Sequence, residues 1–176
     1  SDVPGNGFSF DLGSHLVDQV LVQFGVPEAI FADVRHDRDI TQIHDAFMIY
    51  FFYPRLRVQA SSTLLACAPG PRFVLNGTLG SYVKYGVDPQ EQAMKDGATP
   101  SDPHWGEAPE TSWGRLTTMR DGKTVERVVP TLPGDYRKYY ENVRDAILGI
   151  VPLAVPAEHG WRVIRLMEIA QQSSKE

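Results

Sequence analysis

The sequence predicts an α+β fold, with an open, predominantly antiparallel β-sheet, helices on one face of the sheet, and the other face used for oligomerisation. Three observations support this class. Short strand-like runs follow one another through the middle of the chain, Asp121-Gly122 marks a tight hairpin between two of them, and the longest helical patterns lie at the two ends. No internal repeat interrupts this order, so residues 1–176 are expected to form a single domain.

The first predicted element is a helix that opens near Asp11. Its apolar residues recur at helical spacing and form the expected buried stripe, which consists of Leu12, Leu16, Val20 and Phe24. Gly25 favours the end of the helix, because glycine readily adopts the backbone conformation that terminates one, and Pro27 cannot continue it.

Strand-like runs fill the middle of the chain, at Glu28–Arg35, Asp45–Tyr53, Leu56–Ala66, Arg72–Asn76, Ser81–Tyr85, Arg115–Arg120 and Thr124–Val129. The run ending at Tyr53 is apolar on both alternating faces, whereas a strand with one wet face should alternate. We therefore expect both faces of its sheet to be covered, one by helices and the other by a partner subunit. Cys67 follows in a strand-like run and is expected to be a buried, inert thiol.

The remaining predicted elements are helices at Asp88–Asp96, Asp135–Leu148 and Pro156–Ser173. The segment Ala98–Trp113 contains prolines, glycines, two tryptophans and several acids without periodicity. It is predicted to be a long surface loop, and long ordered loops often cover sites.

Composition excludes several classes of partner. The formal net charge of −5 and the absence of a basic cluster argue against nucleic acid. No apolar run is long enough to span a membrane, and no signal-peptide pattern is present. The single cysteine excludes an internal disulfide and fits a reducing cytoplasm.

Asp11 and His15 are the candidate catalytic residues, because residues four apart share one face of a helix. A carboxylate beside an imidazole can orient the ring and fix its tautomer, which suits a proton acceptor near neutral pH. Two alternatives remain open from the residues alone. Asp11 could simply cap the first turn, or the pair could supply two metal ligands, although no other pair at metal-ligand spacing completes a site.

Four stretches carry a family resemblance: Gly7–Gln19, Gly70–Gly86, Val87–Gly97, and the end from Tyr139 to Met167. Together they resemble the Gfo/Idh/MocA oxidoreductases, the glucose–fructose oxidoreductase and inositol dehydrogenase superfamily, and in particular its scyllo-inositol-dehydrogenase-like branch. The resemblance runs from about Gly5 to Ser174, which is nearly the whole chain.

The resemblance implies that a Rossmann domain precedes this one, binds NAD or NADP, and carries a catalytic lysine in a Glu-Lys-Pro motif. This chain contains neither that motif nor the glycine fingerprint of a dinucleotide site. It is therefore expected to be the C-terminal substrate-binding and oligomerisation domain of a cytoplasmic NAD(P)-dependent enzyme, and to be inactive alone.

The resemblance also implies the chemistry, which is hydride transfer between the cofactor and a secondary alcohol of a sugar or cyclitol. His15 would accept the hydroxyl proton, Asp11 would orient His15 or bind a neighbouring hydroxyl, and Ser14 beside them is a further expected substrate contact. His104 and Trp105 lie in the long loop, which could be either an aromatic lid over a polyol or a merely flexible loop. The sheet is implied to pack against another subunit of a homo-oligomer.

Two other functions remain open. The chain could be a non-enzymatic dimerisation or ligand-binding module whose site residues are vestigial, or a metal-dependent enzyme that uses Asp11 and His15 as ligands. We expect no metal site, since no set of histidine, cysteine and carboxylate residues has recognisable ligand spacing.

Overall fold

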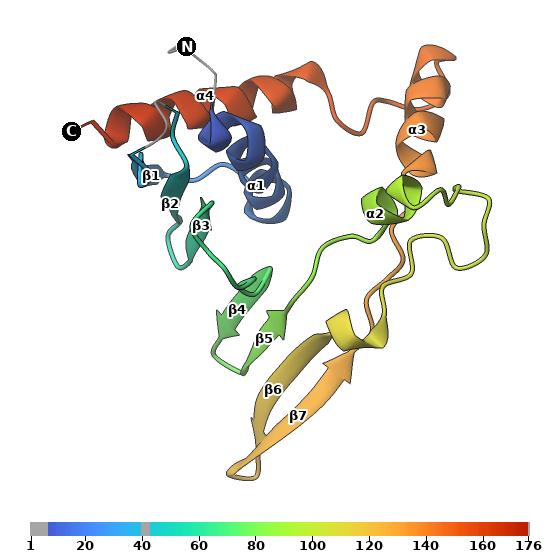
Figure 1. Ribbon diagram of the computed structural model, residues 1–176, viewed down its shortest axis with the longest axis horizontal. Helices are drawn as coiled ribbons and strands as arrows, with labels where there is room; N and C mark the ends of the chain where they lie inside the picture. The colour runs from blue at the N-terminus through green and yellow to red at the C-terminus, as the bar shows by residue number, and fades with distance from the viewer. Residues whose placement is uncertain (1–6, 40–42, 176) are drawn as a thin grey trace. The chain divides into compact units, whose positions relative to one another are not determined.

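The structure is a computed structural model that describes residues 7–39 and 43–175. The chain forms two compact units, one made of residues 1–67 with 155–176 and the other of residues 68–154. Figure 1 shows the helices and strands along the chain. The α+β class with antiparallel strands is confirmed, and the strands form two sheets, of three and four strands.

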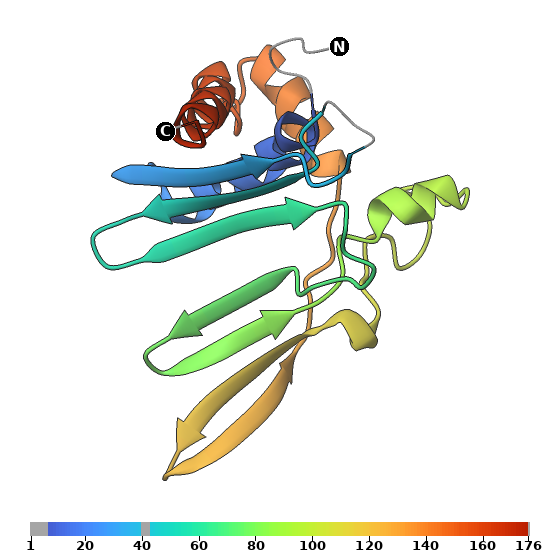
Figure 2. The ribbon, with the colours of Figure 1, turned by 60° about the vertical axis from the view of Figure 1, so that its left-hand side comes forward.

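The first unit is a three-stranded antiparallel sheet with helices on one side (Figure 2). The strand order is β1-β2-β3, and the strands are β1 Ala29–Arg35, β2 Ala46–Phe52 and β3 Arg57–Thr63. The register places Ile49 of the central strand opposite Ala32 and Ala60. The covering helices are α1 Phe8–Phe24 and α4 Ala157–Ser173. All of these bounds lie within three residues of the predicted ones.

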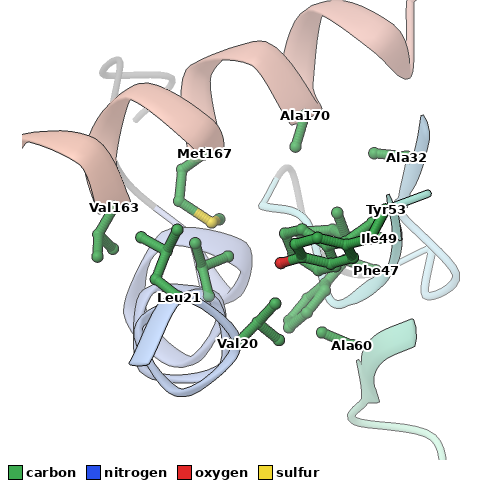
Figure 3. Close-up of a cluster of buried hydrophobic side chains, with 12 residues drawn as sticks. Val20, Leu21, Ala32, Phe47, Ile49, Tyr53, Ala60, Val163, Met167 and Ala170 are labelled. Atoms are coloured by element: carbon green, nitrogen blue, oxygen red, sulfur yellow. The ribbon is translucent and has the colours of Figure 1, made fainter. Parts of the chain in front are cut away.

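The core of this unit lies between the sheet and the two helices (Figure 3). One alternation of β2 faces the helices and is fully buried, namely Phe47, Ile49 and Phe51. The helices contribute Val17, Val20, Leu21, Val163, Met167 and Ala170. In Figure 3, Val163 and Met167 extend from α4 toward Leu21 of α1.

The predicted buried stripe of α1 is confirmed in part, because Val20 is buried and Leu16 and Phe24 pack against the core, but Leu12 does not. The buried residues are Ser9, Gly13, Val17, Val20 and Leu21, and Leu12 is absent from the core cluster. The reason is the close packing of α4. A Cβ placed on Gly13 would lie 2.8 Å from the terminal methyl of Met167, so a glycine at this point lets the two helices approach. Apolar periodicity alone does not count glycine as a contact residue.

The start and end of α1 settle two sequence expectations. The helix begins after Gly7, which provides no side-chain cap, and the backbone N–H of Asp11 already donates to the Gly7 carbonyl at 3.1 Å. Asp11 therefore lies inside the first turn, and its reading as the capping residue is wrong. Gly25 ends the helix as predicted, with φ of 76° and its N–H on the Leu21 carbonyl at 2.9 Å.

The other alternation of β2 faces away from the helices. Met48, Tyr50 and Phe52 are half-buried, and Tyr50 lies opposite Phe31, which is 53% exposed. The two rings are 6.4 Å apart between centroids. Tyr50, Phe52 and Phe31 thus form an aromatic strip on the outward face of the sheet. The partner subunit that we expect to cover this strip stays a prediction.

The second unit is built on a four-stranded antiparallel sheet in the order β4-β5-β6-β7. Its elements are β4 Phe73–Gly77, β5 Gly80–Lys84, α2 Gln90–Lys95, the short 3₁₀ helix η1 Glu110–Ser112, β6 Gly114–Arg120, β7 Lys123–Val129 and α3 Arg137–Ile147. The β6–β7 hairpin turns at Asp121 and Gly122, both with positive φ, of 52° and 70°, as its sequence predicts.

Two further expectations concern single features. Cys67 is exposed, because β3 ends at Thr63 and the thiol lies in the following turn, so the prediction of a buried thiol is wrong. Among the described residues, no helix is long and apolar enough to cross a membrane.

Candidate functional site

The candidate catalytic residues lie together on α1. Asp11 and His15 are exposed and Ser14 is half-buried, and the Ser14 hydroxyl donates to the Asp11 carbonyl at 3.0 Å. Over residues 7–39 and 43–175, no hydrogen bond joins the Asp11 carboxylate to the His15 ring. Helical spacing thus brings the two groups to one exposed face, but it does not couple them to each other.

A second carboxylate–imidazole pair follows one turn later. Asp18 Oδ1 lies 2.6 Å from His159 Nε2, so the ring N–H donates to the carboxylate and ties α1 to the start of α4. The side chain of His159 is only 23% exposed. Sequence reasoning missed this pair because its two members are 141 residues apart. The sequence offered one signal for Asp18, which is its position three residues after His15 on the same face of α1.

An open depression lies beside Asp11, with a volume of about 380 Å³. Its lining combines polar and apolar residues, namely Gly7, Phe8, Asp11, Arg38, Ile43, His44 and Leu64. Neither Ser14 nor His15 lines it. Such a mixture of apolar wall and few polar groups is typical of small-molecule sites.

Arg38 is fixed at the rim of this depression by a buried acid. Arg38 Nε donates to Asp45 Oδ2 at 2.8 Å, and the Asp45 side chain is 1% exposed. Asp45 also accepts the backbone N–H groups of Asp37 at 2.7 Å and Arg38 at 3.1 Å. The Asp37 N–H first and the Arg38 guanidinium second hold the pKa of the Asp45 carboxyl below its usual range. Asp45 balances the positive charge of Arg38. The carboxylate of Asp11 therefore adds a negative charge to the depression that Arg38 does not neutralise.

The predicted loop residues His104 and Trp105 belong to the second unit, whereas Asp11, Ser14 and His15 belong to the first. His104 has a φ of 64°, is largely exposed, and its Nδ1 lies 2.9 Å from Glu107 Oε2. Trp105 is half-buried, and its indole Nε1 is buried without a hydrogen-bond partner in the part of the chain that the structure describes.

The loop is fastened next to Trp105. Gly106 is buried, and its carbonyl accepts the N–H of Gly134 at 3.2 Å. A Cβ on Gly106 would lie 1.9 Å from the Gly134 carbonyl oxygen, so the two backbones are in direct contact. Within the second unit, this part of the loop is therefore held rather than free.

Lys84 has a structural role in the second unit. Its Nζ donates to the carbonyls of Ser112 at 2.8 Å and Tyr85 at 3.3 Å, so it ties β5 to the end of η1. These contacts occupy the ammonium group with backbone oxygens.

The residues present do not fit a dinucleotide site. Every strand pair in the described ranges is antiparallel, whereas a dinucleotide fingerprint requires a parallel βαβ unit with a glycine-rich turn. Over the same ranges, no group of three or more histidine, cysteine, aspartate or glutamate residues could hold a metal ion.

Comparison with known protein families matches residues 1–176 to the Gfo/Idh/MocA oxidoreductase family, C-terminal alpha/beta domain. The chain therefore belongs to the Gfo/Idh/MocA oxidoreductases, and the matched part is their C-terminal domain. The resemblance expected from the sequence is confirmed.

Two bacterial proteins and a solved structure are similar to the chain. It is 37% identical over 170 residues to scyllo-inositol 2-dehydrogenase (NADP(+)) IolW of Bacillus subtilis, covering 97% of this chain and 48% of that protein. It is 38% identical over 172 residues to the uncharacterised oxidoreductase YdgJ of Escherichia coli, covering 98% and 49%. A solved structure of the putative oxidoreductase yvaA of Bacillus subtilis matches with a TM-score of 0.93 at 36% identity, covering 99% and 51%. The chain thus spans about half the length of these relatives.

Proposed function

We propose that this chain is the substrate-binding and oligomerisation domain of an NAD(P)-dependent oxidoreductase that acts on a secondary alcohol of a sugar or cyclitol. The proposal rests on the placement of Asp11 and His15, which share one exposed face of α1, and on the open depression that Asp11 lines. The name of the Bacillus subtilis relative, an NADP-dependent scyllo-inositol dehydrogenase, supports a cyclitol as substrate.

His15 acts as the proton acceptor in this proposal. Its imidazole is exposed on α1, so a bound hydroxyl can reach a ring nitrogen without displacing a protein partner. When the alcohol is oxidised, His15 takes the hydroxyl proton, and it returns the proton in the reverse direction.

Asp11 binds the substrate in this proposal. Its carboxylate accepts a hydroxyl hydrogen bond from a ligand in the depression, while Phe8 and Leu64 supply the apolar wall. The charge of Arg38 is balanced by Asp45, so the free carboxylate of Asp11 favours an uncharged polyol over an acid or a phosphorylated sugar. Ser14, which lies beside Asp11 on α1, is proposed as a further substrate contact.

The nicotinamide cofactor lies outside this chain in our proposal, held by a preceding Rossmann domain that also supplies the catalytic lysine. The antiparallel sheets of the described residues offer no site for the cofactor pyrophosphate. Calorimetric titration of the isolated chain with NADPH and NADH should accordingly detect no micromolar binding. Micromolar affinity would mean that the boundaries of the cofactor site are misassigned.

The activity is tested on the full-length protein. Purified protein is incubated with NAD⁺ or NADP⁺ and a panel of cyclitols, neutral sugars, sugar acids and sugar phosphates, and the reduced cofactor is followed by absorbance. We expect turnover with neutral polyols and little with the charged compounds. Nicotinamide-independent binding of a polyol, with no turnover of any secondary alcohol, would favour the alternative of a ligand-binding module with vestigial residues.

A further inference from the structure

The row on α1 does not stop at His15. Asp11, His15 and Asp18 follow one another at spacings of four and three residues, which keeps all three on one helical face. His159 at the start of α4 adds an imidazole to the end of this row through its contact with Asp18. Acid and imidazole groups therefore alternate along this face, and within residues 7–39 and 43–175 only Asp18 and His159 of this row are hydrogen-bonded to each other through their side chains.

The two carboxylates of the row differ in how they are held. Asp18 is anchored to a second helix by the 2.6 Å contact with His159, whose own backbone N–H is held by the Pro156 carbonyl at 2.9 Å. The side chains of His159 and Asp18 are 23% and 46% exposed. Asp11, by contrast, has no side-chain hydrogen bond in the described ranges and lines the depression.

We propose that Asp18, held by His159, is the positioning residue for His15, and that Asp11 is left to bind the substrate. This inference rests on the proposed role of His15 as the proton acceptor. A carboxylate can accept hydrogen bonds at both oxygens. Asp18 Oδ1 takes the N–H of His159, and Oδ2, one turn from His15, accepts the N–H of the His15 ring when the site is assembled.

This contact fixes the tautomer of His15. The ring nitrogen that faces Asp18 carries the hydrogen, and the other nitrogen is left as the acceptor for the substrate hydroxyl. His159 keeps the Asp18 carboxylate from rotating freely, so the orientation of His15 is set by a contact between two helices rather than by one flexible side chain.

The test uses the full-length protein with the Asp18→Asn, His159→Ala and double variants. Asparagine retains one acceptor for His159 but replaces the second carboxylate oxygen with a donor, so it cannot also accept from His15. We expect Asp18→Asn to lower kcat by roughly 10- to 100-fold, the range for partners that orient a functional histidine, with KM changed less than about twofold. His159→Ala should lower kcat in the same direction, and the double variant should be no slower than Asp18→Asn alone.

Controls separate this inference from a structural role and from the proposed function. Glu158→Gln removes a neighbouring ion pair with Arg162 on α4 and should leave kcat unchanged. Asp11→Asn should raise KM more than it lowers kcat. The inference is overturned if Asp18→Asn keeps wild-type kcat while His15→Ala is slow, whether or not the melting temperature of Asp18→Asn falls. If His15→Ala itself turns over normally, the proposed function fails instead.

Discussion

Gln90 accepts the backbone N–H of Tyr136 at 2.8 Å through its side-chain oxygen, and thereby joins α2 to the start of α3. Gln90 is fully buried, and its Nε2 donates to both carboxylate oxygens of Asp88, at 3.0 and 3.1 Å. Gly134 lies against the same groups, with no room for a side chain. This polar cluster supports the segment next to Trp105 within the second unit.

The first prediction concerns this cluster. Gln90→Leu keeps a similar volume but leaves the Tyr136 N–H without its acceptor and removes the side-chain hydrogen bonds to Asp88, so we expect the free energy of unfolding to fall by about 1–3 kcal/mol. Urea denaturation of the isolated chain measures it. Gln92→Leu is the matched control, because Gln92 is exposed and should change stability by less than about 0.5 kcal/mol. Equal effects of the two changes would show that the buried amide contributes nothing.

The second prediction compares two glycines of the second unit that share a left-handed backbone. Gly106 has φ of 74° and Gly149 of 71°, so alanine pays a similar conformational cost at each. Only Gly106 is in contact with another backbone, at Gly134. We expect Gly106→Ala to destabilise by about 1–3 kcal/mol more than Gly149→Ala, as overpacking does. Similar melting temperatures for the two variants would contradict the close approach.

The third prediction follows from the lowered pKa of Asp45. The native carboxyl binds a proton more weakly than the unfolded one, whose ordinary pKa is about 3.9. The stability it contributes is therefore present above that value and is lost as the pH falls toward the native pKa. Asp45→Asn should lower stability at neutral pH and flatten its decline in acid. Urea melts across this range test it, with Asp121→Asn at the exposed β6–β7 turn as the control that keeps the wild-type slope.

Much of the fold could be predicted because it depends on local signals. Gly25 and Pro27 end α1, and Asp121-Gly122 turns the last hairpin, since each of these residues acts on its own backbone. The apolar run of β2 likewise indicated a sheet strand, although which alternation faces the helices required the structure and the cover of the other face stays a prediction.

What the sequence could not provide depends on contacts between distant residues. The true buried face of α1 is set by Gly13 against Met167. The pairing of Asp18 with His159 depends on how α4 packs, and the depression beside Asp11 requires a loop of the first unit to approach α1. Motif spacing therefore selected Asp11 and His15 as candidates but could not predict the groups that surround them.

The fourth prediction concerns oligomerisation through the outward face of β2. Tyr50 lies in the centre of this aromatic strip, opposite Phe31. If a second subunit covers it, Tyr50→Glu buries an unpaired charge at a cost of about 2–5 kcal/mol and should dissociate the assembly. Light scattering compares it with Val22→Glu, a charge placed at an exposed position of α1. A wild-type chain that is already a clean monomer of 19.6 kDa would refute this interface.

The most direct measurement of the central claim is kcat for His15→Ala in the full-length protein. If His15 is the proton acceptor, kcat should fall by roughly 10²- to 10⁴-fold, the usual scale for losing a general base, while the melting temperature stays close to wild type because the side chain is exposed. Gln23→Ala, at another exposed position of α1, should keep wild-type turnover. Near-normal turnover of His15→Ala with an unchanged pH profile would contradict the account.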